Sequence, residues 1–212
     1  MNADCLRMRV SRILVCLLAS VAAMASATAA PPDAPAAAAA VAAVRLPADS
    51  VYQLALLLTD QQGRALPLAA GRGHPVLVSM FYTSCQFVCP MLVEALRATE
   101  SKLSAAERAH LTVLMVSIDP EHDSVAVLER TTRQRELDTA RWSLARTDAK
   151  SVRKLAAVLG IQYRALANGE FNHSTALILL DSEGRIAART AHLGDADPAF
   201  VRRVKASLAA LP

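Results

Sequence analysis

The chain has 212 residues, of which 53% are hydrophobic and 4% aromatic, and its formal net charge is +4. This length and apolar content suffice for one well-buried domain but hardly for two. The net charge is small and no cluster of Lys and Arg stands out beyond the amino-terminal segment, so the sequence does not support a nucleic-acid-binding protein.

The amino-terminal segment has the pattern of an export signal. Arginines precede the uninterrupted apolar run 13–24, and small residues that offer the A-x-A pattern of a cleavage site follow at 25–29. We interpret residues 1–29 as a signal peptide. The alternative is an uncleaved membrane anchor, because the apolar stretch 13–30 is close to the shortest that spans a bilayer. Both interpretations place the protein in the periplasm or at the outer face of the inner membrane, and only an uncleaved leader would attach it to the membrane.

The cysteines become informative once the leader is set apart. Residues 30–46 are rich in Ala and Pro and are predicted to be a flexible linker, which leaves 47–212 as one domain. Two of the four cysteines lie in the leader, so the exported domain keeps only Cys85 and Cys89. A cysteine pair in an oxidising compartment closes a disulfide, cycles between thiol and disulfide, or binds metal.

The domain is predicted to begin with a β-hairpin and a buried strand. Strand-forming residues at 51–58 and 64–68 flank the turn 60–63, which together predict an added amino-terminal hairpin. The short apolar run 76–82 then predicts a central strand that is buried on both faces.

Pro90 indicates where the first helix begins. Because proline is tolerated only in the first turn of a helix, the helix that includes 91–103 is expected to start close to Cys89, with Cys85 in the loop before it. The sequence of 104–107 is a capping box, which predicts a further short turn of helix.

The later elements alternate between strands and helices. They are a buried strand at 111–118, a helix at 124–137, a strand at 142–145, a helix at 148–159, a hairpin of 175–180 with 185–191, and a helix at 198–211. A βαβ pattern followed by a ββα unit predicts an α/β thioredoxin-like sandwich. Active groups of open α/β sheets lie beyond the carboxyl ends of strands, which is where Cys85 and Cys89 fall.

The C-x-x-x-C spacing places one sulfur in a loop and the other at a helix amino terminus. The partial positive charge there favours thiolate, which binds soft metals and also attacks disulfides, so the spacing alone leaves both roles open. A purely structural disulfide between Cys85 and Cys89 is not favoured, because closing so short a loop stabilises a fold weakly.

The position of His173 favours a metal site over a purely redox-active cysteine pair. Thioredoxins usually have two residues between their cysteines, and the segment that faces the cysteines holds a cis-proline. In this chain three residues separate Cys85 from Cys89. No proline occurs between 121 and 197, and His173 occupies the position of the cis-proline. Two thiolates and one imidazole suit Cu(I) in trigonal geometry, and the imidazole also makes Cu(II) tolerable. We find no fourth protein ligand for a structural zinc ion. The predicted metal ligands are therefore Cys85, Cys89 and His173.

Three segments of the chain resemble the SCO/SenC family of copper chaperones: FYTSCQFVCP at 81–90, VSIDPE at 116–121 and NHST at 172–175. They follow one another in the family's order, within a resemblance that covers roughly 47–211. The resemblance implies that the two cysteines and the later histidine bind copper. It also implies delivery of copper, or of reducing power, to the binuclear copper centre of a membrane subunit of cytochrome c oxidase or to another cuproprotein.

The sequence departs from the family at two positions beside the site. Asn172 stands where an aspartate is common before the histidine, and Ser84 stands where a histidine is common before the first cysteine. Asp119 is expected either to accept a hydrogen bond from His173 or to cap the next turn. His122, close by, is interpreted as a surface residue.

Two enzyme functions stand beside the binding and transfer function. In a thiol-disulfide oxidoreductase, Cys85 and Cys89 would be a redox-active pair that reduces the cysteines of the copper target, and His173 would tune the thiolate pKa. A peroxidase of the peroxiredoxin type would need an arginine and a threonine around one attacking cysteine, and the sequence offers no convincing match.

Overall fold

The computed structural model describes residues 45–85 and 88–211. The segments interpreted as signal peptide or anchor, and nearly all of the linker, lie outside the described residues, so those interpretations stay predictions. Within the described ranges, none of the helices has the length and apolar character needed to cross a bilayer.

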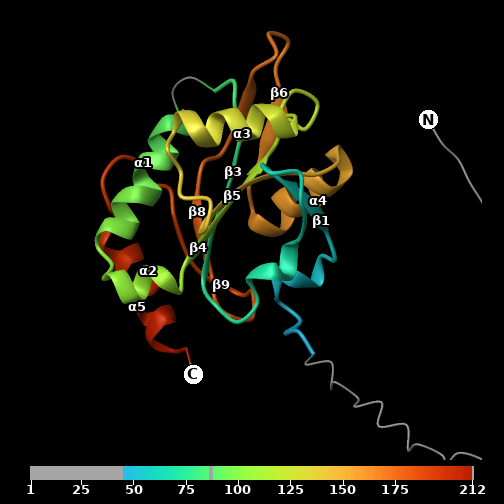
Figure 1. Ribbon diagram of the computed structural model, residues 1–212. Helices are drawn as coiled ribbons and strands as arrows, with labels where there is room; N and C mark the ends of the chain where they lie inside the picture. Colours follow the sequence, from blue (N-terminus) through green and yellow to red (C-terminus); the bar gives the residue numbers. More distant parts are fainter. Residues whose placement is uncertain (1–44, 86–87, 212) are drawn as a thin grey trace, which may run out of the picture. The chain divides into compact units, whose positions relative to one another are not determined.

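A seven-stranded sheet forms the centre of the domain, in the order β2-β1-β5-β4-β3-β8-β9 (Figure 1). Its strands are β1 (Leu57–Asp60), β2 (Ala65–Pro67), β3 (Val76–Phe81), β4 (Thr112–Ser117), β5 (Trp142–Arg146), β8 (Leu177–Leu180) and β9 (Ile186–Thr190). Strands β3, β4 and β5 are parallel, whereas β8 and β9 on one side and β1 and β2 on the other are antiparallel.

Helices cover both faces of this sheet. They are α1 (Val88–Ser101), α2 (Ala105–Ala109), α3 (Val125–Gln134), α4 (Ala149–Leu159) and α5 (Pro198–Ala209). Figure 1 shows α1 and α5 on one side of the central strands and α4 on the other. All six residues of β3 are buried, as expected for a strand with both faces covered. The predicted α/β thioredoxin-like sandwich is confirmed.

The capping residues that predict the ends of α2, α4 and α5 form these caps in the structure. Ser104 and Glu107 form the capping box of α2, the side chain of Asp148 accepts hydrogen bonds from the first turn of α4, and Gly160 ends α4 with a φ of 62°. Asp197 caps α5 in the same way, directly before its proline.

The first strand begins later than the sequence indicates. Val51–Gln53 form a 3-10 helix (η1), and β1 starts only at Leu57. The side chain of Ser50 caps this turn, and Tyr52 is buried with its ring against Gly184, where an added Cβ would lie 2.4 Å from the ring. The strand-forming residues of η1 therefore reach the core through a helical turn, because packing overrides β-propensity.

The turn of the added hairpin is organised by Asp60. Its buried carboxylate accepts hydrogen bonds from the backbone N–H groups of Gln62 (2.8 Å) and Arg64 (2.9 Å) and from the Arg64 guanidinium (2.8 Å). Burial works to raise the pKa of this carboxyl, but the hydrogen bonds from Arg64 and Gln62 outweigh it and hold the pKa below its ordinary value of 3.8.

We expect Asp60→Asn to destabilise the domain by about 1 kcal/mol at neutral pH, because the amide loses the charged acceptor and the ion pair. A carboxyl whose pKa is lower in the folded chain stabilises it above the unfolded pKa, and this contribution is lost as the pH falls through the folded pKa. The difference between wild type and variant in urea unfolding should therefore shrink between pH 5 and pH 2. A difference that is unchanged at low pH would contradict this assignment.

A short hairpin that the sequence analysis did not predict lies apart from the central sheet. It consists of β6 (Tyr163–Ala165) and β7 (Phe171–His173), which pair only with each other in the described chain. The backbone N–H of Leu166 donates to the Glu170 carbonyl (2.8 Å), and Gly169 in the turn has a φ of 82°. The dipeptide Asn168-Gly169 is a hairpin signal that could have predicted it.

Candidate metal centre

The cysteine loop lies between the end of β3 and the start of α1. The helix begins at Val88 with Pro90 in its first turn, as predicted, so Cys89 lies at the helix amino terminus. The backbone N–H of Cys89 donates to the sulfur of Cys85 at 3.4 Å, and the N–H of Cys85 reaches the Tyr82 carbonyl at 3.4 Å. The contact between them holds the two cysteines close together, with Cys85 before α1 and Cys89 in its first turn, and no disulfide joins them.

Both thiols are largely buried, with exposed fractions of 8% for Cys85 and 7% for Cys89. Burial, followed by the effect of the neighbouring Cys85 sulfur, raises the pKa of the Cys89 thiol well above its usual range, although a hydrogen bond from the Tyr82 backbone opposes this. The helix terminus alone would favour a thiolate at Cys89, but desolvation is the larger effect. A metal ion that binds this sulfur must therefore displace a proton.

A small cavity opens beside the two sulfurs. Its volume is about 20 Å³, and its lining includes Cys85, Cys89, Tyr82, Thr83 and Arg135. Such a space holds one water molecule or one ion of similar size. Its two thiols are soft donors, of the kind that Cu(I) and zinc take in proteins.

A buried carboxylate supports the start of the loop. Asp123, with 1% of its surface exposed, accepts hydrogen bonds from the backbone N–H of Thr83 (3.2 Å), from the Thr83 hydroxyl and from the Ser117 hydroxyl. Burial raises the pKa of the Asp123 carboxyl, and the hydroxyl and backbone donors oppose that shift. The sequence analysis missed this residue, although a polar group after a central strand is a sign of a site.

Asp119 has a different partner from the one considered for it. Its carboxylate lies 2.8 Å from Nδ1 of His122, three residues further on, and makes no contact with His173 in the described chain. The hydrogen bond to Asp119, and then its charge, raises the pKa of His122, whose side chain is 76% exposed. The hydrogen-bond partner of the Asp119 carboxylate is therefore His122 and not His173.

His173 is the last residue of β7, where it pairs with Tyr163. Its Nδ1 lies 3.3 Å from the Ser174 carbonyl oxygen. Because a carbonyl only accepts hydrogen bonds, this contact requires the proton on Nδ1 and leaves the lone pair of the neutral ring on Nε2. Burial lowers the pKa of His173, against the smaller effect of the Ser174 carbonyl, which favours the neutral, ligating form.

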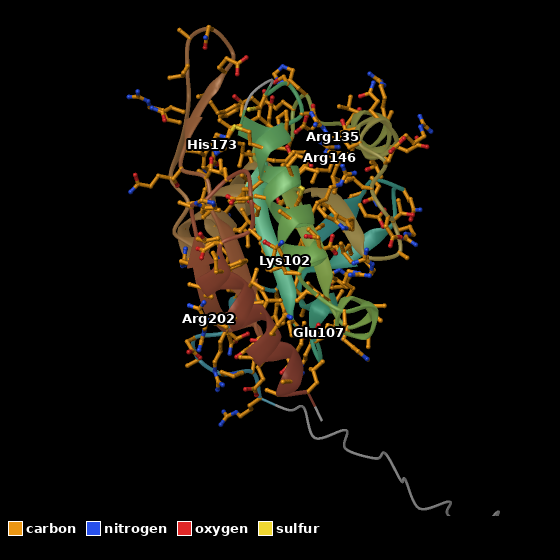
Figure 2. All side chains as sticks on the ribbon, turned by 90° about the vertical axis from the view of Figure 1, so that its left-hand side faces the viewer. Lys102, Glu107, Arg135, Arg146, His173 and Arg202 are labelled. Atoms are coloured by element: carbon orange, nitrogen blue, oxygen red, sulfur yellow. The ribbon has the colours of Figure 1, made fainter. Side chains whose placement is uncertain are left out.

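The ring of Tyr82 connects the histidine strand to the cysteine loop. Its centroid lies 5.7 Å from that of His173 and 5.2 Å from that of Phe171, both in edge-to-face geometry. Tyr82 directly follows β3 and stands three residues before Cys85. Figure 2 shows His173 at the same end of the view as Arg135, which lines the cavity beside the sulfurs.

The ring of Tyr82 links His173 to the cysteine loop, but the candidate ligands do not form a closed metal site. Across 45–85 and 88–211, no three or more His, Cys, Asp or Glu side chains are gathered closely enough to hold a metal ion. The hollow beside His173 is lined by residues of the hairpin, whereas the cavity of the two thiols does not include His173. Ligation by Cys85, Cys89 and His173 together stays a prediction.

The family SCO1/SenC matches residues 48–208. The chain belongs to the SCO1/SenC family. This membership agrees with the resemblance that the three sequence segments indicate. No curated protein sequence matches the chain.

Solved structures of other Sco proteins share the fold. Yeast Sco1 with copper bound is 18% identical, with a TM-score of 0.61 over 73% of this chain and 86% of that one. A SCO1/SenC family lipoprotein from Bacillus anthracis is 22% identical, with a TM-score of 0.63 over 71% and 91%. BsSco, described as a member of the Sco family of cytochrome c oxidase assembly proteins, is 17% identical, with a TM-score of 0.62 over 73% and 92%.

Proposed function

We propose that this SCO1/SenC protein is a metallochaperone that binds one copper ion through Cys85, Cys89 and His173 and delivers it to a cuproprotein. The observation that carries the proposal is the ring contact of Tyr82 with His173, since it joins the histidine strand to the loop of the two thiols. Copper bound to yeast Sco1 supports the choice of metal.

The donor chemistry favours Cu(I) as the cargo. Two thiolates and one imidazole Nε2 supply soft and borderline donors, and three ligands suffice for Cu(I). Binding displaces the proton of the buried Cys89 thiol. Transfer then proceeds as thiolates of the target replace those of Cys85 and Cys89 one at a time, so that the copper is never free.

The recipient is a protein on the outer side of the inner membrane. The description of BsSco supports a subunit of cytochrome c oxidase as the target. Export through residues 1–29, as a cleaved signal or a retained anchor, would place the chaperone in the periplasm or at that membrane face. The Bacillus anthracis relative is described as a lipoprotein, which supports attachment of this chain to a membrane.

An anaerobic titration of the purified chain with Cu(I) tests the proposal. We expect saturation at one copper per chain, with ultraviolet absorption from thiolate-to-copper charge transfer that reaches its full value at the same ratio. The competing chelator used to measure affinity should recover all of the metal. Saturation at a ratio far from one, or no charge-transfer absorption, would contradict a copper site built from these sulfurs.

A thiol-disulfide oxidoreductase is the second candidate, because the backbone N–H of Cys89 donates to the sulfur of Cys85 and so holds the two cysteines close together. In that reaction Cys85 and Cys89 form a disulfide while the disulfide of the target is reduced to two thiols, so the electrons balance. His173→Ala separates the two functions. We expect the variant to lose tight copper binding, whereas an oxidoreductase would keep most of its rate of disulfide reduction.

A further inference from the structure

The hairpin that carries His173 is attached only loosely to the rest of the domain by backbone pairing. Strands β6 and β7 pair with each other and with no strand of the seven-stranded sheet in the described chain. The position of the imidazole relative to the cysteine loop therefore has to be set by side-chain contacts across the space between them.

Tyr82 makes those contacts from the cysteine side. The residue is 3% exposed, and its ring packs edge-to-face against Phe171 and His173 of β7. Its hydroxyl donates a hydrogen bond of 2.6 Å to the carboxylate of Glu170, the residue that directly precedes β7. One side chain of the hydrophobic core thus contacts Glu170, Phe171 and His173 of the hairpin.

We propose that Tyr82 and Glu170 are positioning residues that hold the hairpin, and with it His173, against the cysteine loop. The hydrogen bond to a charged acceptor fixes the start of β7, and the edge-to-face contact sets the distance of the imidazole ring from the loop. The purpose of this Tyr82–Glu170 pair, to present the third ligand to copper, depends on the proposed function. Its existence as a restraint on the hairpin does not.

The restraint acts on the release of the metal. If His173 must move away before a target thiolate can reach the copper, the hairpin has to open, and opening breaks the bond between the Tyr82 hydroxyl and Glu170. A hydrogen bond to a charged group has a net effect equivalent to about tenfold in an equilibrium constant. The pair is therefore expected to slow detachment of His173 by about that factor.

Hydrogen exchange of the copper-free chain tests the restraint by itself. Tyr82→Phe removes the hydroxyl and keeps the ring. The backbone N–H groups of Leu166 and Ser174 donate to the carbonyl oxygens of Glu170 and Gln162 across the hairpin. We expect these two amides to exchange about tenfold faster in the variant than in the wild type. The matched control is Tyr163→Phe, in the same hairpin, because the Tyr163 hydroxyl has no hydrogen-bond partner among the described residues. The control should change these rates less than twofold.

Two results would overturn the proposal. Hairpin amides that exchange at the wild-type rate in Tyr82→Phe would show that the hydroxyl restrains nothing. Equal acceleration of the central sheet, for example at the Val113 amide that donates to Arg141, would show that Tyr82 serves the general stability of the fold.

Copper release tests the purpose of the pair. We expect Tyr82→Phe and Glu170→Ala each to speed transfer of Cu(I) to a chelator several-fold, and the double variant to be no faster than the faster single one, because each change removes the bond between the Tyr82 hydroxyl and Glu170. Additive effects would contradict the pairing. If wild-type protein binds no copper, the proposed function fails, while the exchange experiment still decides whether the restraint exists.

Discussion

Replacing Cys85 or Cys89 by serine is expected to lower the affinity for Cu(I) by more than about 100-fold, and His173→Ala by about 100-fold. Residues that only support metal ligands typically cost 10–100-fold when replaced, and loss of a direct ligand costs at least as much. The hydroxyl of serine is a hard donor that Cu(I) does not favour. Competition with a chelator of known affinity measures each change, and metal analysis gives the stoichiometry.

The chain offers matched controls for both kinds of ligand. Met91, which is 46% exposed and two residues after Cys89, is a nearby sulfur outside the proposed site. His122 is an exposed histidine that pairs with Asp119. Met91→Leu and His122→Ala should leave the affinity within about twofold of wild type. An unchanged copper content in any of the three ligand variants, or a large loss in either control, would refute the assignment.

Asp123→Ala is expected to cost about 3 kcal/mol of folding stability and to loosen the cysteine loop. The substitution leaves the Thr83 N–H and the hydroxyls of Thr83 and Ser117 without their acceptor in a buried place. Each such buried donor costs about 1–3 kcal/mol when unsatisfied, and relief of the buried charge recovers part of the sum. Urea unfolding measures the stability, and hydrogen exchange of the loop measures its mobility.

Asp119→Ala is the control for this effect. Asp119 is also buried, but its carboxylate binds the exposed ring of His122 and supports no part of the loop. We expect a loss of at most about 1 kcal/mol and no change in exchange at Cys85. If the two aspartates had equal effects on the loop, the support would come from the whole 119–123 turn and the assignment to Asp123 would be wrong.

Sequence patterns predict the elements whose signals are local. The apolar runs at 76–82 and 111–118 predict buried strands, which the structure has as β3 and β4, and Pro90 places the start of α1 within a residue or two of Cys89. The strand predicted at 51–58 was wrong over its first half, because Ser50 caps a helical turn there and Tyr52 packs against Gly184. That contact joins residues far apart in the chain, which no local pattern records.

In the candidate site, too, some features can be predicted from local sequence and others depend on contacts between distant residues. The chemistry of two thiols and an imidazole can be inferred from residue types and their order, and so can the position of the thiols at the end of β3. The strands that carry His173 are three residues long, too short for a periodic signal, and the partner of Asp119 depends on the direction of its side chain. The contact of Tyr82 with Glu170 spans 88 positions and emerges only from the folded chain.

Because the hairpin is no part of the central sheet, the residue at its end can change without altering the pairing of the sheet strands. In the proposed site the fold separates two tasks, with the sheet and α1 holding the sulfur pair while the hairpin supplies the third donor. A different side chain at the end of β7 is then expected to change the coordination number and the metal preference of the proposed site and to leave the central sheet intact. The metal preference of the proposed site could then change by substitution at one hairpin position, without any change in the central sheet.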